Sequence, residues 1–208
     1  MHQSNSPQGL ILASASPRRQ ELLSQAGLQF QIITSDIDEE SILADTPRIL
    51  AAAIAQAKAR EVATLHPENW ILAADTLVVA GDQVLGKPAN PEEAVSMLKR
   101  LSGISHQVIT GVALCCTAQK KLRSYAVTTD VSFKELTAQE IAWYTATPEP
   151  YDKAGAYAIQ GLAAHFIRHI CGSYTNVVGL PICEVMESLS LAGIVPSYVQ
   201  NQNGVHAL

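Results

Sequence analysis

The chain has 208 residues, 48% of them hydrophobic and 16% charged, which is enough apolar material for one domain or two small lobes. This composition excludes intrinsic disorder, collagen and a coiled coil as descriptions of the whole chain. Fourteen basic and 19 acidic residues give a formal net charge of -5. That charge argues against broad non-specific nucleic-acid binding, but it allows a local basic pocket for a small anion.

Hydrophobic periodicity predicts strands and helices connected by short loops. Helices are expected to begin at Pro17, at Pro47, after Asn90, after Thr137 and near Pro181, where proline or capping side chains stand. Strands are expected at residues 9–14, 30–34, 70–79, 84–85, 106–117, 122–133, 166–170 and 176–178. Several strands follow one another without a helix between them. The pattern therefore predicts an α/β fold with a mixed, elongated sheet flanked by helices.

Cysteine spacing and hydropathy bear on metal binding and cellular location. The four cysteines include no C-x-x-C pair, which argues against a zinc site or a disulfide framework. The N-terminus has no basic segment followed by a long apolar run, and no stretch approaches the roughly 20 apolar residues of a membrane span. We therefore expect a soluble, cytoplasmic protein that has no membrane partner and no stable nucleic-acid partner.

The first candidate site is the segment Ser14-Ala15-Ser16-Pro17-Arg18-Arg19 at the expected start of a helix. A helix N-terminus presents unpaired N–H groups and a partial positive charge, both of which suit a phosphate. Arginine adds bidentate phosphate contacts. The alternative is a helix capped by Ser16 with two solvated arginines.

Asp75 is the second candidate, because it is a lone acid in a strongly apolar strand. An unpaired buried carboxylate is costly, so Asp75 needs a cation, a metal or strong hydrogen bonds. It is either part of a buried salt bridge, or a metal ligand or general base.

Two further charged segments could belong to the same site. Lys87, in Gly86-Lys87-Pro88, could pair with a phosphate or with Asp75, or be a solvated loop lysine. One acid of the loop at residues 36–40 could complete a Mg²⁺ site with Asp75, whereas the others are expected to face solvent.

A loop at residues 147–161 contains the run Asp152-Lys153-Ala154-Gly155-Ala156-Tyr157-Ala158-Ile159-Gln160-Gly161. The amide of Gln160 both donates and accepts hydrogen bonds, so it could read the edge of a nucleobase. The sequence contains neither a Walker-type glycine loop nor a G-x-S-x-G motif.

Five ordered motifs together resemble the Maf family of nucleoside triphosphate pyrophosphatases, and the resemblance runs from about Leu10 to Leu189. The motifs are residues 14–23, Ala74-Asp75-Thr76, Gly86-Lys87-Pro88, Leu101-Ser102-Gly103 and residues 152–161. The resemblance implies an α/β fold similar to that of inosine triphosphate pyrophosphatases, with a cleft between two lobes. Residues 8–195 are then a single two-lobed catalytic domain, and residues 196–208 are expected to form a flexible tail.

The resemblance also implies an activity and a set of site residues. The family hydrolyses a nucleoside triphosphate to the monophosphate and pyrophosphate with a divalent cation, Mg²⁺ or Mn²⁺. Asp75 matches the proton acceptor, and Glu39 and Asp75 are expected at the metal; the two roles of Asp75 compete, because one carboxylate is not readily both a tight metal ligand and a strong base. Phosphate-binding positions match Ser14, Arg18, Arg19, Lys58 and Lys87, and base specificity is linked to Arg18, Thr76 and Gln160.

A glutamine at position 160 is similar to the group of the family that acts on dTTP and UTP, whereas the group acting on 7-methyl-GTP carries glutamate there. Ala158 and Gly86 depart from the pattern of the pyrimidine group, in which glycine and glutamate are expected at these positions. The same chemistry on 7-methyl-GTP or another base is one alternative, and a non-enzymatic nucleotide-binding regulator of cell division is another. A phosphatase with Asp75 as nucleophile is disfavoured, because no second aspartate lies two residues after it. The resemblance also suggests a homodimer.

Overall fold

The computed structural model describes residues 9–196, so residues 197–208 of the expected tail lie outside it. The strands are β1 (Leu10–Leu12), β2 (Phe30–Ile32), β3 (Trp70–Ala80), β4 (Gln83–Leu85), β5 (Ser105–Cys116), β6 (Lys121–Phe133) and β7 (Ile167–Cys171). The helices are α1 (Pro17–Gln25), α2 (Pro47–Leu65), α3 (Pro91–Leu101), α4 (Ala138–Thr145), α5 (Tyr174–Val178) and α6 (Ile182–Leu191). Short 3₁₀ turns are η1 (Glu39–Ser41), η2 (Glu149–Asp152), η3 (Ala154–Ala156) and η4 (Leu162–Phe166).

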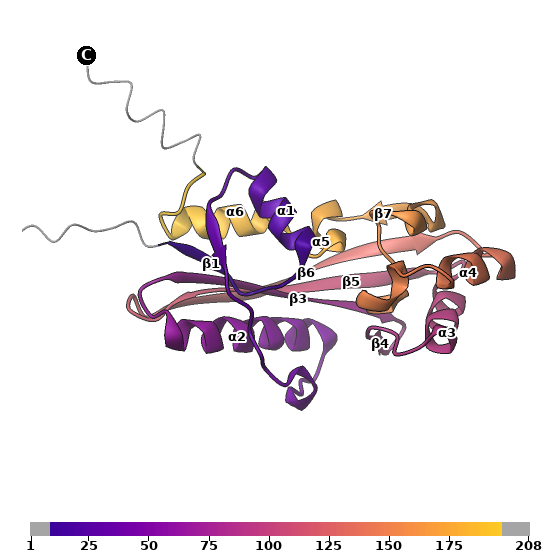
Figure 1. Cartoon of the computed structure of the whole chain (residues 1–208), viewed down its shortest axis with the longest axis horizontal. Helices are drawn as coiled ribbons and strands as arrows, with labels where there is room; N and C mark the ends of the chain where they lie inside the picture. Colours follow the sequence, from indigo (N-terminus) through magenta and orange to yellow (C-terminus); the bar gives the residue numbers. More distant parts are fainter. Residues whose placement is uncertain (1–8, 197–208) are drawn as a thin grey trace, which may run out of the picture.

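All the described strands belong to one seven-stranded sheet, in the order β2-β1-β3-β5-β6-β7, with β4 paired to β3. β1 runs parallel to both β2 and β3, and the other pairs are antiparallel. The long strands β3, β5 and β6 extend along the whole molecule (Figure 1). This mixed, elongated sheet confirms the predicted fold class.

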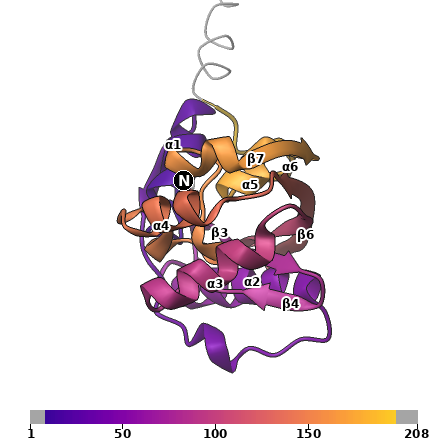
Figure 2. The ribbon, with the colours of Figure 1, turned by 90° about the vertical axis from the view of Figure 1, so that its right-hand side faces the viewer.

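Helices cover both faces of the sheet. α2 lies along one face, whereas α1, α5 and α6 lie on the other (Figure 1). Figure 2 shows the end of the molecule at which α3 and α4 are found. Successive residues of β3 alternate between the faces: Ile71 and Ala73 pack with α2, and Leu72 and Ala74 pack with α1 and α6. By the same alternation, Asp75 lies on the α2 face and Thr76 on the α1 face.

Apolar clusters occupy both ends of the long strands. One cluster joins α3, α4 and η3 to the far parts of β3, β5 and β6. Two others pack α1, α2 and α6 against β1 and the near half of β3. A fourth cluster packs Val79 and Leu77 against α2, so Asp75 and Thr76 are the residues of β3 that belong to no apolar cluster.

The middle of β3 also lacks a partner strand on one side. The pairing of β1 with β3 ends at Leu12 and Leu72, and the pairing of β4 with β3 involves only Val78–Ala80. Residues 73–77 pair with β5 on the other side. A gap of this kind lets side chains from both faces of the sheet reach one opening.

Two local predictions are wrong. Residues 176–178 belong to α5 rather than to a strand, because the Ser173 side chain accepts a hydrogen bond from the Asn176 N–H and starts a helix. The Ser16 side chain makes no capping hydrogen bond at the start of α1, although Pro17 occupies the first turn as predicted. By contrast, Thr137 and Glu140 form the expected capping box of α4.

No helix within residues 9–196 is long and apolar enough to cross a membrane. The four cysteines are free thiols: Cys115 and Cys116 are buried in β5, and Cys171 and Cys183 are exposed.

Candidate active site

A cleft of about 950 Å³ opens at the unpaired stretch of β3. Its walls come from the loop between β1 and α1, from η1, α2 and α5, and from the segments around β4 and η3. All nine residues proposed from the sequence line it: Ser14, Arg18, Arg19, Glu39, Lys58, Asp75, Thr76, Lys87 and Gln160. Segments that are up to 146 positions apart in the chain (Ser14 to Gln160) thus meet at one place.

On the α2 face, the ammonium of Lys58 joins two carboxylates. Its Nζ lies 2.8 Å from Asp75 Oδ1 and 2.8 Å from Glu39 Oε1. The side chains of Lys58 and Asp75 are only 12% and 11% exposed, whereas that of Glu39 is 50% exposed. Asp75 therefore forms the buried ion pair that its apolar surroundings require, and Lys58, not Lys87, is its partner.

On the opposite face, the guanidinium of Arg19 is fixed by three hydrogen bonds. Nε donates to Gly179 O at 2.8 Å, one terminal nitrogen donates to Ser14 Oγ at 3.0 Å, and the other donates to Thr76 Oγ1 at 3.1 Å. Burial lowers the pKa of Arg19 below its usual value, and the negative charge of Asp75 partly opposes this shift. Arginine stays protonated in proteins, so Arg19 supplies a positive charge of fixed orientation.

The O–H group of Ser14 is free to donate a hydrogen bond. Its oxygen accepts hydrogen bonds from Arg19 and, at 3.3 Å, from the Ser16 N–H. A hydroxyl has two lone pairs and one proton, so both acceptor positions of Ser14 are occupied and its O–H remains available as a donor. Ser14 thus faces the cleft as a hydrogen-bond donor, the kind of group that an anion requires.

Arg18 lies beside Arg19 but points across the cleft. Its guanidinium is 3.4 Å from Asp152 Oδ2 of η2, and the Asp152 side chain is 64% exposed. This long, exposed pair contributes little to folding stability, since solvent screens it. Arg18 is consequently the more available of the two arginines for a ligand.

A main-chain hydrogen bond joins the segment that contains Lys87 to the loop that contains Gln160. The Gly155 N–H donates to Gly86 O at 3.0 Å, which places the residue before Lys87 against that loop. Gly155 has a φ of 69°, and a Cβ there would lie 2.8 Å from a methyl carbon of Val78, so glycine allows the loop to contact β3. Lys87 is exposed on the cleft wall, and no described residue forms an ion pair with it.

Glu149 holds the two ends of the Gln160 loop together, a role that the sequence did not indicate. Its carboxylate accepts hydrogen bonds from the Leu162 N–H at 2.9 Å and from the Tyr144 hydroxyl at 3.1 Å. The Gln160 side chain is exposed into the cleft, and no hydrogen bond ties it to a described residue. The loop is thus fixed at its base and presents a free amide.

A buried pair, Tyr157 and His106, links the same loop to β5. Tyr157 lines the cleft, and its hydroxyl lies 2.7 Å from Nε2 of His106 in β5. Burial lowers the pKa of His106 to about 4, so its ring is uncharged at neutral pH. Sequence reasoning missed this pair, because the 51 positions between the residues leave no local signal.

Of the five carboxylates that line the cleft, Glu39 and Asp75 lie together at the ammonium of Lys58 and are the pair available to a divalent cation. Within residues 9–196 no cluster of three or more acidic, histidine or cysteine side chains could hold a metal ion without help. Mg²⁺ commonly binds through one or two carboxylates together with substrate phosphates and water. The donor set therefore fits a metal that is bound jointly with a phosphorylated ligand rather than a resident metal site.

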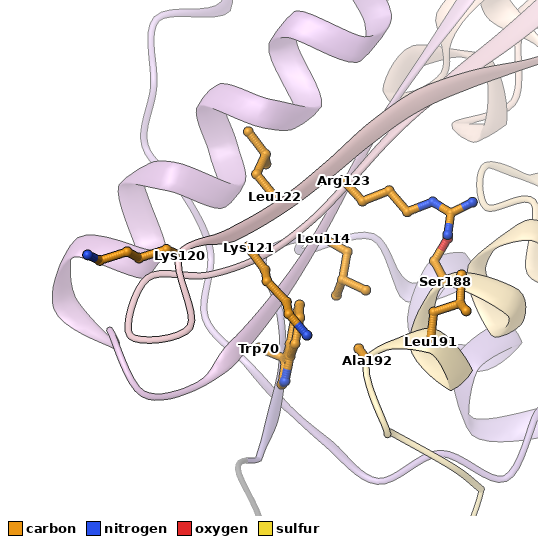
Figure 3. Close-up of a pocket in the computed structure, with 9 residues that line it drawn as sticks. All are labelled: Trp70, Leu114, Lys120, Lys121, Leu122, Arg123, Ser188, Leu191 and Ala192. Carbon is orange, nitrogen blue, oxygen red and sulfur yellow. The ribbon is translucent and has the colours of Figure 1, made fainter.

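A second, smaller pocket of about 320 Å³ lies where the β5–β6 turn approaches the end of α6 (Figure 3). Lys120, Lys121 and Arg123 contribute three cations to it, and Trp70, Leu114, Leu122 and Leu191 contribute apolar surface. None of its lining residues is an acid, so this pocket lacks a candidate proton acceptor.

Among solved structures, a HAM1 protein from Coxiella burnetii has 19% sequence identity and a TM-score of 0.42 over 60% of this chain and 72% of its own. The Ham1 protein of Staphylococcus aureus gives 12% identity and a TM-score of 0.41 over 60% and 71% of the two chains. These scores are too low to support an argument about this chain.

Sequence relatives are much closer. A protein of Syntrophus aciditrophicus named dTTP/UTP pyrophosphatase is 50% identical over 88% of this chain and 90% of its own length. A protein of Geobacter sulfurreducens with the same name is 50% identical over 88% and 96% of the two chains. The Maf-like protein family matches residues 9–192. With nearly the whole described chain inside this match, the protein belongs to the Maf family.

Proposed function

We propose that this chain is a nucleoside triphosphate pyrophosphatase that converts dTTP and UTP to the monophosphates and pyrophosphate. The carrying observation is that all nine sequence-predicted polar residues line one cleft, with Asp75 beside Lys58 and Arg19 across the edge of β3. The names of relatives that are 50% identical over 88% of the chain support the same activity and the same bases.

The triphosphate binds to the cationic side chains and to the free O–H donor of Ser14. Arg19 uses three of its five N–H groups on protein atoms, which leaves two for phosphate oxygens. Arg18, Lys58 and Lys87 supply further positive charge. Charge placed around the bridging oxygen of the leaving pyrophosphate stabilises the transition state more than the ground state.

Asp75 is the proton acceptor in this proposal. Lys58 holds Oδ1, and no described residue donates a hydrogen bond to Oδ2, so Oδ2 can accept a proton from water. The water oxygen bonds to the α-phosphorus, the bond from that phosphorus to the bridging oxygen breaks, and pyrophosphate leaves with the electron pair. The proton released by the water passes to Asp75.

Cleft charge supports a requirement for Mg²⁺ or Mn²⁺. The lining contains five cationic side chains and five carboxylates, so it is nearly neutral, whereas a triphosphate carries several negative charges. Glu39 and Asp75 are the residues that would hold the cation, and at Asp75 this role competes with proton acceptance, because Lys58 already holds one of its two oxygens. When bound, it neutralises phosphate charge and polarises the phosphoryl group.

Base selection is assigned to Arg18, Thr76 and Gln160. The free amide of Gln160 can donate to and accept from the edge of uracil or thymine, both of which present a carbonyl and an N–H side by side. A cytoplasmic location, expected from cysteine spacing and hydropathy, and a homodimer, suggested by the family resemblance, also remain predictions.

A panel of triphosphates tests the activity. Purified protein with Mg²⁺ or Mn²⁺ should release pyrophosphate from dTTP and UTP at least about tenfold more efficiently than from CTP or 7-methyl-GTP, as an amide-to-base hydrogen bond can discriminate by that factor or more. A preference for 7-methyl-GTP would overturn the assigned base. Tight nucleotide binding without turnover under either metal would favour a non-enzymatic regulator.

A further inference from the structure

A buried hydroxyl outside the cleft lining, that of Thr110, contacts the Thr76 hydroxyl within it. Thr110 of β5 is fully buried and is the direct cross-strand partner of Thr76 in β3. Its Oγ1 lies 2.9 Å from Thr76 Oγ1 and 3.0 Å from the main-chain oxygen of Asn176 in α5. Thr110 thus connects the cleft wall to the helix behind it.

The chemistry of the groups fixes the direction of each hydrogen bond. A main-chain oxygen can only accept, so Thr110 donates its single proton to Asn176 O. Thr110 must then accept a hydrogen bond from Thr76, and this bond uses the only proton of the Thr76 hydroxyl. With its proton directed away from the cleft, Thr76 accepts the hydrogen bond from Arg19 at 3.1 Å.

Asn176 is itself held in place, so the start of this chain of bonds is rigid. Its side-chain nitrogen donates to Val108 O and to Thr129 Oγ1, each at 3.0 Å, and the residue is fully buried. Its main-chain oxygen also accepts from the Gly179 N–H at 3.0 Å. Gly179 in turn offers its own oxygen to Arg19 Nε, so both contacts of Arg19 on this side depend on α5.

We propose that Thr110 is a positioning residue of the active site. It holds the Thr76 hydroxyl as an acceptor towards Arg19 and thereby fixes the plane of the guanidinium that faces the triphosphate. The expected effect on kinetics rests on the proposed function, but the orientation of Arg19 can be measured without any nucleotide. Without the Thr110 hydroxyl, the Thr76 proton is free to rotate towards Arg19 and to compete with its N–H group.

The test compares Thr110→Val, which is nearly isosteric, with Thr110→Ser, which keeps the hydroxyl. Thr145→Val is the matched control: Thr145 is also buried and donates to a main-chain oxygen, that of Ile141, but it lies in α4 and does not line the cleft. Thermal unfolding identifies any variant that fails to fold. Thr110→Ala serves if valine does not fit.

The primary readout is the side-chain NMR spectrum of Arg19 in the nucleotide-free protein. Distinct, slowly exchanging guanidinium N–H signals are expected in the wild type, in Thr110→Ser and in Thr145→Val, and averaged signals in Thr110→Val. Unchanged Arg19 signals in Thr110→Val or Thr110→Ala would overturn the proposal, whatever the enzyme does with nucleotides.

The second readout is steady-state kinetics on dTTP. Thr110→Val should raise KM about tenfold, roughly one hydrogen bond to a charged group, with kcat changed less than KM because Asp75 and Lys58 lie on the other face of the sheet. Thr110→Ser should restore KM. An equal loss in Thr110→Val and Thr145→Val would show a merely structural role, and absence of turnover in the wild type would contradict the proposed function alone.

Discussion

Lys58 is the residue that decides how the acidic part of the cleft behaves. A single ammonium pairs with two carboxylates at 2.8 Å each, so Asp75 has a cationic partner and a fixed orientation in a nearly buried position. The alternatives of buried salt bridge and general base are therefore compatible. One oxygen of Asp75 serves the ion pair, and the other is free of protein donors among the described residues.

Asp75→Asn tests whether the second carboxylate oxygen of Asp75 accepts the proton from water. The amide keeps the shape of the side chain but cannot accept a proton from water, so turnover of dTTP should fall by about 10²–10⁴-fold. Asp130→Asn is the control, since Asp130 is exposed on β6 and its side chain contacts Gln107. Initial-rate assays of pyrophosphate release measure both variants, and near-normal turnover in Asp75→Asn would remove its assigned role.

The position of α2 on the sheet places Lys58 beside Asp75. Gly111, the cross-strand partner of Asp75, allows this approach: a Cβ at Gly111 would lie 2.0 Å from the main-chain oxygen of Ala51 in α2. No side chain fits at that distance. The glycine thus allows α2 to approach β5 closely at Ala51, about two helical turns before Lys58.

Gly111→Ala is expected to push α2 away from β5. Overpacking of this kind costs about 1–3 kcal/mol or more of unfolding free energy, and the displaced Lys58 should lower turnover as well. Gly86→Ala is the matched control for stability, because a Cβ there meets no atom within 4 Å. Denaturant unfolding compares the two, and equal stability would contradict the close approach.

Elements with strong local signals were predictable from the sequence, whereas contacts between distant segments were not. Proline and capping side chains marked the starts of α1, α2 and α4. The short helix α5 was missed, since its five residues carry too little periodicity to be told from a strand. Thr110 gave no signal of its own, because the register that places it opposite Thr76 is a property of the folded sheet.

The site residues were predictable mainly through the family motifs. From the residues alone, Asp75 required a partner, but the local pattern offered Lys87 rather than Lys58 of α2, 17 positions earlier. The link between Lys58 and Glu39 depends on the path of η1 past α2, which no short-range pattern encodes. Glu149 and His106 act through contacts across the chain and were equally hidden.

For the whole molecule, the net charge of -5 is a poor guide to the ligand. The cleft lining balances five cations against five carboxylates, and the unpaired stretch of β3 lets both faces of the sheet contribute to it. Ser14 and Arg19, which we propose bind phosphate, lie on the α1 face, and Asp75, the proposed proton acceptor, lies with Lys58 on the α2 face. This arrangement suits attack at the phosphorus that lies between the base and the leaving group.

Hydrolysis in water enriched in ¹⁸O tests the central claim most directly. If Asp75 directs water to the α-phosphorus, mass spectrometry of the dTTP products will show one labelled oxygen in dTMP and none in pyrophosphate. Label in pyrophosphate would mean attack at the β-phosphorus, and label in inorganic phosphate would mean attack at the γ-phosphorus. Either result would contradict the mechanism proposed for this cleft.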